Sequence, residues 1–258
     1  MPTRKFWNTS ITRVEPNSIR VRGYDVAELM GKRSFGDVVF MLFSGELPQG
    51  NEGKLVETIL VAGCDHSLAA PSADTVRFVA SSGVPLQASV AAGITALGDS
   101  HGGAIEQCAR IFQEAKPAGK DVGAMAADIL AGFRARKERV PGYGHPQHTA
   151  DPRTGRLLGL ARQWGLTGPH TELALAIEAA IERQLGKRLP LNVDGAIAGV
   201  MSDMGLDWRL GKGFYVISRA SGLIAHYYEQ LTQEKPFKEV PWQDIEYWGP
   251  PPRPVPDP

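Results

Sequence analysis

Hydrophobic residues recur along most of this chain at the spacing of α-helices. Leu173, Ile177, Ala180 and Ile181 fall at i, i+4, i+7 and i+8, which places them on one face of a helix over residues 172–185. Other helical segments, bounded by Gly, Pro or capping residues, are predicted over residues 38–43, 72–80, 86–97, 124–133, 196–204 and 214–231. The pattern therefore predicts a mainly α-helical protein.

The first thirty residues follow a different pattern. Ile19 and Val21 alternate with Arg20 and Arg22, and the preceding Glu-Pro-Asn-Ser at 15–18 is a turn signal. We expect a short N-terminal β-hairpin here. Strands and helices do not alternate along the rest of the chain, so a doubly wound parallel sheet is not expected.

Local signals predict where some helices begin and end. Ser34 and Asp37 have the spacing of a capping box ahead of the apolar run at 38–43, and Gly45 predicts its end. Ser72, after Pro71, is predicted to cap a second helix. The Pro-rich stretch at 249–258 must be extended, lying over the surface or on a partner.

Composition excludes several classes of function. The 258 residues carry 28 basic and 28 acidic side chains, so no global basic field favours nucleic acid. The apolar runs are too short for a membrane span, and the N-terminus shows no secretory signal. Cys64 and Cys108 form neither a disulfide framework nor a metal pattern and are interpreted as small buried residues. We expect a soluble, cytoplasmic globular protein, built as one large domain or as a domain with a sizeable insertion, with a substantial core.

The segment from Pro141 to Arg153 is the first candidate for chemistry. Two glycines and a proline hold His145 in a loop, and Arg153 follows a second proline, interpreted as a helix breaker. Histidine transfers protons near neutral pH, and arginine binds carboxylate or phosphate with a planar fork. His145 and His148 also have a spacing open to metal ligands, but no Cys or carboxylate completes a zinc set, so we expect no metal.

Four further residues stand in unusual surroundings. His101 lies in a Gly-rich segment, His66 follows an apolar helix, Asp194 precedes a small-residue helix, and Arg219 lies within an apolar helix. Each has a structural alternative: a surface or core histidine, a helix cap for Asp194, a buried ion pair for Arg219. Together they supply what proton transfer on a carboxylate-bearing substrate requires.

Four motifs in the same order resemble the citrate synthase superfamily, and the resemblance runs from about residue 22 to 247. They are Gly-Asp-Ser-His-Gly-Gly-Ala at 98–104, Gly-Tyr-Gly-His…Asp-Pro-Arg at 142–153, Leu-Asn-Val-Asp-Gly at 191–195 and Ser-Arg-Ala-Ser-Gly-Leu-Ile-Ala-His at 218–226. The opening at 10–30 and Pro-Trp-Gln-Asp-Ile-Glu-Tyr at 241–247 are similar to the citryl-CoA lyase module of ATP-citrate lyase. The chain is much shorter than a typical citrate synthase, which favours a stand-alone lyase of citryl-CoA.

The resemblance implies a set of roles. The catalytic trio would be His101, His145 and Asp194, and the dicarboxylate site would draw on His66, Arg153 and Arg219. It implies an all-α, two-domain fold, with 1–103 plus 213–258 as the large domain and 104–212 as an inserted domain that closes over coenzyme A. Coenzyme A would be part of the substrate, and a homodimer or higher homo-oligomer is expected.

Three departures from the family pattern bear on these roles. Pro146, Gln147 and His148 stand where basic residues of the family usually hold coenzyme A. His148 or Arg156 is therefore the candidate to bind coenzyme A in their place. Lys235 is the nearest counterpart of an arginine donated across the dimer. His101 is often missing from the lyase module, so its presence keeps open citrate or 2-methylcitrate synthesis, or a lyase for a related 3-hydroxyacyl-CoA. A non-catalytic CoA-binding subunit is the alternative from another class.

Overall fold

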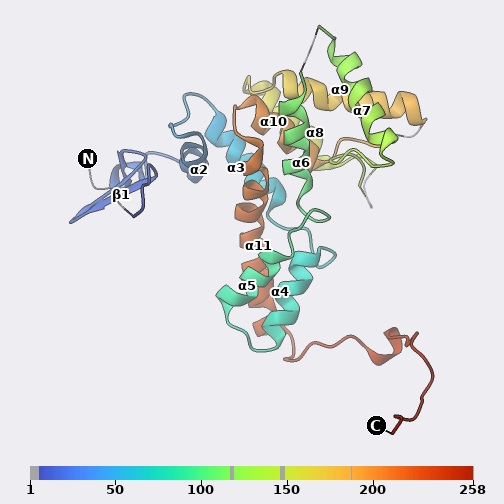
Figure 1. Ribbon diagram of the computed structural model, residues 1–258. Coiled ribbons are helices and arrows are strands. Elements are labelled where there is room, and N and C mark those ends of the chain that lie inside the picture. Colours follow the sequence, from blue (N-terminus) through green and yellow to red (C-terminus); the bar gives the residue numbers. More distant parts are fainter. Residues whose placement is uncertain (1–5, 117–118, 146–148, 187, 258) are drawn as a thin grey trace.

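The computed structural model describes residues 6–116, 119–145, 149–186 and 188–257. It is mainly helical, with one small sheet at the N-terminus, which confirms the fold class expected from the sequence (Figure 1). Pro146, Gln147 and His148 lie outside the described residues, as does Pro258.

The N-terminal sheet is antiparallel, in the order β1 (Thr12–Glu15), β2 (Ser18–Val21), β3 (Tyr24–Asp25). Asn17 takes a left-handed φ of 59° in the predicted turn, and Arg13 lies opposite Arg20 in the register. The predicted hairpin is confirmed, with a short third strand added. Figure 1 shows that the sheet projects away from the helices.

The described residues form eleven α-helices. They are α1 (Val26–Leu29), α2 (Phe35–Ser44), α3 (Glu52–Gly63), α4 (Pro71–Ser81), α5 (Leu86–Thr95), α6 (Ala104–Glu114), α7 (Val122–Ala135), α8 (Pro152–Gln163), α9 (Pro169–Leu185), α10 (Val193–Asp203) and α11 (Gly211–Gln233), with 3₁₀ turns η1 (Trp208–Leu210) and η2 (Trp242–Asp244). The capping box is present, since Ser34 and Asp37 exchange both hydrogen bonds at 3.1 Å, and Gly45 ends α2 with φ 98°.

Helix α11 runs along the centre of the molecule and contacts α3, α4, α5 and α6 (Figure 1). Its N-terminal half meets the group of helices α6–α10, and its C-terminal half lies with α4 and α5. Helix α10 is the most enclosed of the group, with Gly195 through Ser202 all buried against α6, α8 and α9. Residues at both ends of α10 and along α11 are therefore held in fixed positions by the core.

Two local predictions were wrong. Ser72 does not cap α4: the helix begins at Pro71 with Ala70 as its N-cap, so Ser72 lies in the first turn with its side chain buried. Pro152 does not break a helix but begins one, as the first residue of α8 behind the N-cap Asp151. The helices α6 and α8 were not among those predicted.

Beyond α11 the chain is extended and exposed. Phe237 and Lys238 donate backbone hydrogen bonds to Ser81 at 2.7 and 3.1 Å, which fixes only the start of this tail to the end of α4. Trp242, Tyr247 and Trp248 are at least three-quarters exposed. None of the helices in the described residues combines the length and hydropathy needed to cross a bilayer.

Candidate active site

Residues from distant parts of the chain line one cavity of about 400 Å³. Five of the six residues predicted for the site contribute to its wall: His66, His101, His145, Arg153 and Asp194. They come from the segment after α3, the turn before α6, the Gly-rich loop, and the first turns of α8 and α10. The folded chain thus brings together residues up to 128 positions apart, from 66 to 194.

The loop that carries His145 depends on its glycines. Gly142 and Gly144 have φ of 81° and 82°, and a Cβ at Gly142 would lie 2.4 Å from Cys108 Sγ. Gly144 N–H donates to Pro190 O at 2.7 Å, and Asn192 donates to Gly144 O at 3.0 Å. The His145 loop is therefore bonded directly to the segment that precedes Asp194.

Asp194 lies in the first turn of α10 and is not the cap of that helix. Asn192 is the N-cap, and its side chain accepts from the backbone N–H groups of Asp194 and Gly195 at 3.0 and 3.2 Å. Burial raises the pKa of Asp194 to about 6, with nearby Arg153 acting in the opposite direction. A carboxyl group with this pKa both donates and accepts a proton near neutral pH.

His101 is held by a hydroxyl group that the sequence analysis assigned to a helix cap. Its Nε2 lies 3.0 Å from Ser72 Oγ, and Arg219 Nη1 donates to the same oxygen at 3.4 Å. Burial lowers the pKa of His101, and the positive charge of Arg219 lowers it further. Because Arg219 only donates, this arrangement favours a neutral His101 that accepts from Ser72 at Nε2 and carries its proton on Nδ1.

Arg153 is already paired within the chain. Its Nε and Nη2 donate to the two carboxylate oxygens of Asp151 at 3.0 and 2.8 Å, and its Nη1 donates to Ala62 O at 3.3 Å. Burial raises the pKa of Asp151, but the hydrogen bonds from Arg153 outweigh it and lower the pKa below its ordinary value. The bidentate pair fixes Arg153 at the cavity wall with its charge kept.

Arg219 is the one predicted residue that does not line the cavity. It is completely buried behind the wall, where it donates to Gly63 O at 3.1 Å and to the hydroxyl of Tyr215 at 2.9 Å. No carboxylate in the described part of the chain forms an ion pair with it. Tyr215 lines the cavity in front of it, and burial raises the pKa of that phenol, which stays neutral.

Three residues of this wall or its support were not predicted from the sequence. Asp151 holds Arg153, Ser72 bonds His101, and Tyr215 stands between Arg219 and the cavity. A signal existed for Tyr215, because it precedes Arg219 by four residues on a predicted helix and must share its face. His66 lies against His145 with ring centroids 5.6 Å apart, at nearly right angles.

A second cavity of about 600 Å³ shares Gly144 and His145 with the first. Its wall combines apolar residues of α7 and α9 with two arginines, Arg134 and Arg139, and with Glu138, whose carboxylate is paired with Arg136 at 2.7 Å. Arg156, which the sequence suggested as a substitute ligand, lies on the exposed side of α8 and lines neither cavity. No group of three or more metal-ligating side chains gathers within the described residues, and His148 is not among them.

The sequence model of the citrate synthase C-terminal domain matches residues 49–239, well over half of the chain. The chain belongs to the citrate synthase family. A citryl-CoA lyase from Hydrogenobacter thermophilus is 44% identical, has a TM-score of 0.91, and is covered over 98% of both chains. This similarity therefore covers almost the full length of both proteins.

Longer members of the family match over part of their length. The ATP-citrate synthase beta chain protein 2 of Arabidopsis thaliana is 29% identical over 91% of this chain and 39% of its own. The chain thus spans about two fifths of the length of that curated relative. An ATP citrate lyase from Methanothrix soehngenii, in complex with citrate and coenzyme A, shares the fold at a TM-score of 0.83, with 24% identity over 97% of this chain and 43% of that one.

Proposed function

We propose that this protein cleaves citryl-CoA to acetyl-CoA and oxaloacetate by a retro-Claisen reaction. The observation that carries the proposal is the single cavity in which His101, His145, Asp194 and Arg153 meet, in a chain that matches a citryl-CoA lyase over its whole length. The reaction needs a base for a hydroxyl group, a donor for a developing enolate oxygen, an acid for the nascent methyl group, and cations for the carboxylates.

In the cleavage direction His145 removes the proton from the tertiary hydroxyl of citryl-CoA. The electron pair of that O–H bond forms the ketone of oxaloacetate, the carbon–carbon bond breaks, and its electrons pass to the thioester as an enolate. His101 donates a hydrogen bond to the enolate oxygen. Because the pKa of His101 is lowered, the ring is neutral in this role. Asp194 then protonates the terminal carbon to give acetyl-CoA.

The dicarboxylate part of the substrate requires positive charge and donors. Arg153 and His66 line the cavity, and Tyr215 presents a phenol that Arg219 hydrogen-bonds from behind. We assign Arg219 the role of holding Tyr215 and Ser72 and of supplying charge to the same carboxylate site through them. Its buried charge acts over a short distance in a medium of low dielectric.

Coenzyme A fits the second cavity, because that cavity continues from His145 into a wall with two arginines. Their charge suits the phosphates of coenzyme A, and the apolar side chains around them suit its adenine ring and pantetheine arm. This placement replaces the basic residues expected directly after His145. Closure of residues 104–212 over the bound ester, as a domain separate from 1–103 and 213–258, is part of the proposal and would exclude water from the enolate.

Replacing Arg139 by Gln is expected to weaken coenzyme A binding about tenfold and to raise the KM for citryl-CoA with kcat nearly unchanged. Steady-state kinetics and calorimetric titration with coenzyme A check this result. Arg183→Gln, on the exposed side of α9, is the matched control and should behave as the wild type. Equal affinities for coenzyme A in Arg139→Gln and wild type would remove Arg139 from the site.

Synthesis of citrate or 2-methylcitrate, or cleavage of a related 3-hydroxyacyl-CoA, is the second candidate, favoured by the presence of His101. Rates measured separately with citryl-CoA and with acetyl-CoA plus oxaloacetate distinguish the two. Fast cleavage with negligible citrate formation selects the lyase, whereas the reverse selects the synthase. Binding of CoA esters without turnover in either assay would select a non-catalytic subunit.

We also propose a homodimer. The tail after α11 exposes Trp242, Tyr247 and Trp248, and α11 exposes Tyr228 and Leu231 near its end, which is more apolar surface than an isolated chain normally shows. Lys235 is exposed next to this surface, so it is the candidate to reach a partner's site. The cytoplasmic location expected from the sequence stays a prediction.

Truncation after residue 240 is expected to shift the protein toward monomer, because it removes the three exposed aromatic residues of the tail. Light scattering coupled to gel filtration, over a dilution series, measures the change. A substitution of Arg253 by Gln in the full chain serves as the control. A truncated protein with the same oligomeric state and the same dimer dissociation constant as the full chain would contradict the role of the tail.

A further inference from the structure

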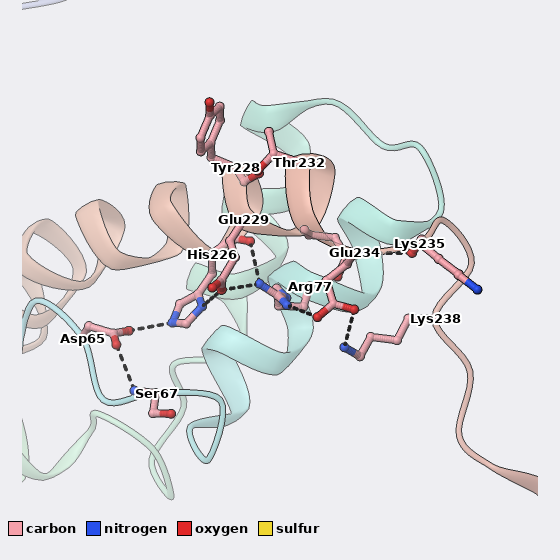
Figure 2. A network of polar contacts seen from close by, with 11 residues as sticks. Asp65, Ser67, Arg77, His226, Tyr228, Glu229, Thr232, Glu234, Lys235 and Lys238 are labelled. Carbon is pink, nitrogen blue, oxygen red and sulfur yellow. Dashed lines mark hydrogen bonds and ion pairs between the residues drawn. The ribbon is translucent and has the colours of Figure 1, made fainter.

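A second polar cluster lies outside the cavity, where the C-terminal half of α11 faces the segment after α3 (Figure 2). His226 Nε2 lies 2.9 Å from Asp65 Oδ1, and the other carboxylate oxygen of Asp65 accepts from Ser67 N–H at 2.9 Å. Burial raises the pKa of Asp65, but the hydrogen bonds from Ser67 and His226 outweigh it and lower the pKa. Asp65 is thus a carboxylate held on both oxygens.

The remainder of the cluster fixes the helix that carries His226. Glu229, whose carboxylate lies 3.7 Å from His226 Nδ1, pairs with the buried Arg77 of α4. Arg77 also donates to Glu234 at 3.2 Å and to the carbonyl oxygen of His226 at 3.5 Å (Figure 2). These contacts join α4 to the last turns of α11, so His226 projects from a rigid support.

Successive positions of helix α11 contact successive residues of the segment 63–65. Arg219 donates to Gly63 O at 3.1 Å. At Gly222 the backbones are so close that a Cβ would lie 2.3 Å from Cys64 O and 3.0 Å from Asp65 Oδ1. His226 then binds Asp65 one helical turn further on. Positions 219, 222 and 226 form one stripe of α11, and the residue that follows the segment, His66, enters the cavity wall.

We infer that His226 is a positioning residue, which holds Asp65 on α11 so that the adjacent His66 faces the dicarboxylate part of the cavity. The contact is better suited to placement than to overall stability. The side chain of Asp65 is 40% exposed, and polar contacts of such exposure contribute little to overall stability. A misplacement of about 1 Å in a residue that positions the substrate, in contrast, can cost about 100-fold in rate.

The inference rests on the proposed function in one respect, namely that His66 binds a carboxylate of oxaloacetate or of the citryl group. His66 also lies against His145, with a centroid distance of 5.6 Å, so a displaced segment would move one ring of that pair. The expected defect is therefore selective: it affects the dicarboxylate and spares coenzyme A, whose proposed cavity does not include residues 63–66.

The test compares His226→Ala and His226→Gln with Glu234→Gln in the full-length protein. Gln places an amide N–H near the position of Nε2, so it should keep the bond to Asp65, whereas Ala cannot. Glu234→Gln weakens the partner of Arg77 at the same end of α11 without touching Asp65. We expect His226→Ala to weaken oxaloacetate binding about 10-fold to 100-fold, with coenzyme A binding unchanged, and the other two variants to stay within about threefold of wild type.

Hydrogen exchange of the unliganded protein gives a reading that needs no activity. Amides of residues 64–70 should exchange faster in His226→Ala than in wild type, and at the wild-type rate in His226→Gln. Gly222→Ala, which forces the segment away from α11 at a different point, should reproduce both effects. A wild-type protein that fails to cleave citryl-CoA would contradict the proposed function but would leave this exchange result to decide the positioning role.

Two outcomes would overturn the inference. One is oxaloacetate binding and exchange at 64–70 that are unchanged in His226→Ala. The other is an equal defect in His226→Ala, His226→Gln and Glu234→Gln, because such a result indicates a general loosening of this end of the molecule and not the placement of His66.

Discussion

Asp194→Asn is expected to lower turnover by about 10²–10⁴-fold while the protein still binds CoA esters. Asn keeps the size of the side chain and its place in the first turn of α10. It can neither donate a proton to the carbon nor remove one from it. Loss of a positioned acid or base typically costs about 10²–10⁴-fold in rate. Single-turnover measurement of citryl-CoA cleavage, with calorimetry for coenzyme A binding, separates chemistry from affinity. Activity within a few-fold of wild type in this variant would contradict the assignment.

Because the pKa of Asp194 is about 6, the rates of cleavage and condensation should change in opposite directions with pH. Cleavage needs protonated Asp194, so kcat/KM for cleavage should fall as the pH rises through about 6. Condensation needs the carboxylate, so its kcat/KM should rise over the same range. Profiles of both directions in wild type provide the measurement, and the inflection near 6 should be missing from the residual activity of Asp194→Asn.

Folding raises the pKa of Asp194 above its ordinary value of 3.8, so the charged form destabilises the folded protein. This penalty is absent below about pH 3.8, grows as the pH rises, and is complete above about 6. Asp194→Asn should therefore be more stable than wild type at pH 7, by up to about 3 kcal/mol for two pKa units. Urea denaturation at several pH values checks the sign, and the difference should shrink toward pH 4.

Arg219→Lys is expected to lose both stability and affinity for the dicarboxylate. Arg219 is completely buried and bonds three groups at once: Gly63 O, Ser72 Oγ and the Tyr215 hydroxyl. A lysine ammonium has no planar fork and cannot reach the three together. Groups left unpaired in the interior cost about 1–3 kcal/mol each, so a loss of about 2–4 kcal/mol in the free energy of unfolding is expected.

Urea denaturation measures the stability of Arg219→Lys, and calorimetry measures its affinity for oxaloacetate. Arg209→Lys is the matched control, because Arg209 is exposed at the surface, where it pairs with Asp207 and lies over the ring of Trp208, and does not line the cavity. If the folded Arg219→Lys variant bound oxaloacetate and cleaved citryl-CoA like the wild type, Arg219 would be a structural residue, and the carboxylate site would consist of Arg153, His66 and Tyr215 alone.

Features of the fold that depend on a few neighbouring residues were predicted from the sequence. The capping box of Ser34 and Asp37 and the left-handed Gly45 depend on a few neighbouring residues, and both are present. The loop of His145 was predicted from its glycines, and its backbone indeed needs positive φ at Gly142 and Gly144. These features required no knowledge of the distant chain.

Ser72 and Arg219 show what the sequence alone did not provide. Serine is a residue type that commonly caps helices, but Pro71 begins this helix and Ser72 lies inside it. The hydroxyl of Ser72 instead forms hydrogen bonds with His101 and Arg219, which lie 29 and 147 positions away. Arg219 was expected at the substrate, whereas the packing of α11 places it behind Tyr215. Both outcomes depend on which helices meet, and hydrophobic spacing does not encode that choice.

The central claim is that this chain breaks the carbon–carbon bond of citryl-CoA. Purified protein supplied with citryl-CoA, with oxaloacetate and acetyl-CoA quantified together, tests it most directly. We predict one oxaloacetate and one acetyl-CoA for each citryl-CoA consumed. Consumption that yields citrate and free coenzyme A, or no consumption by a protein that binds the ester, would contradict the claim.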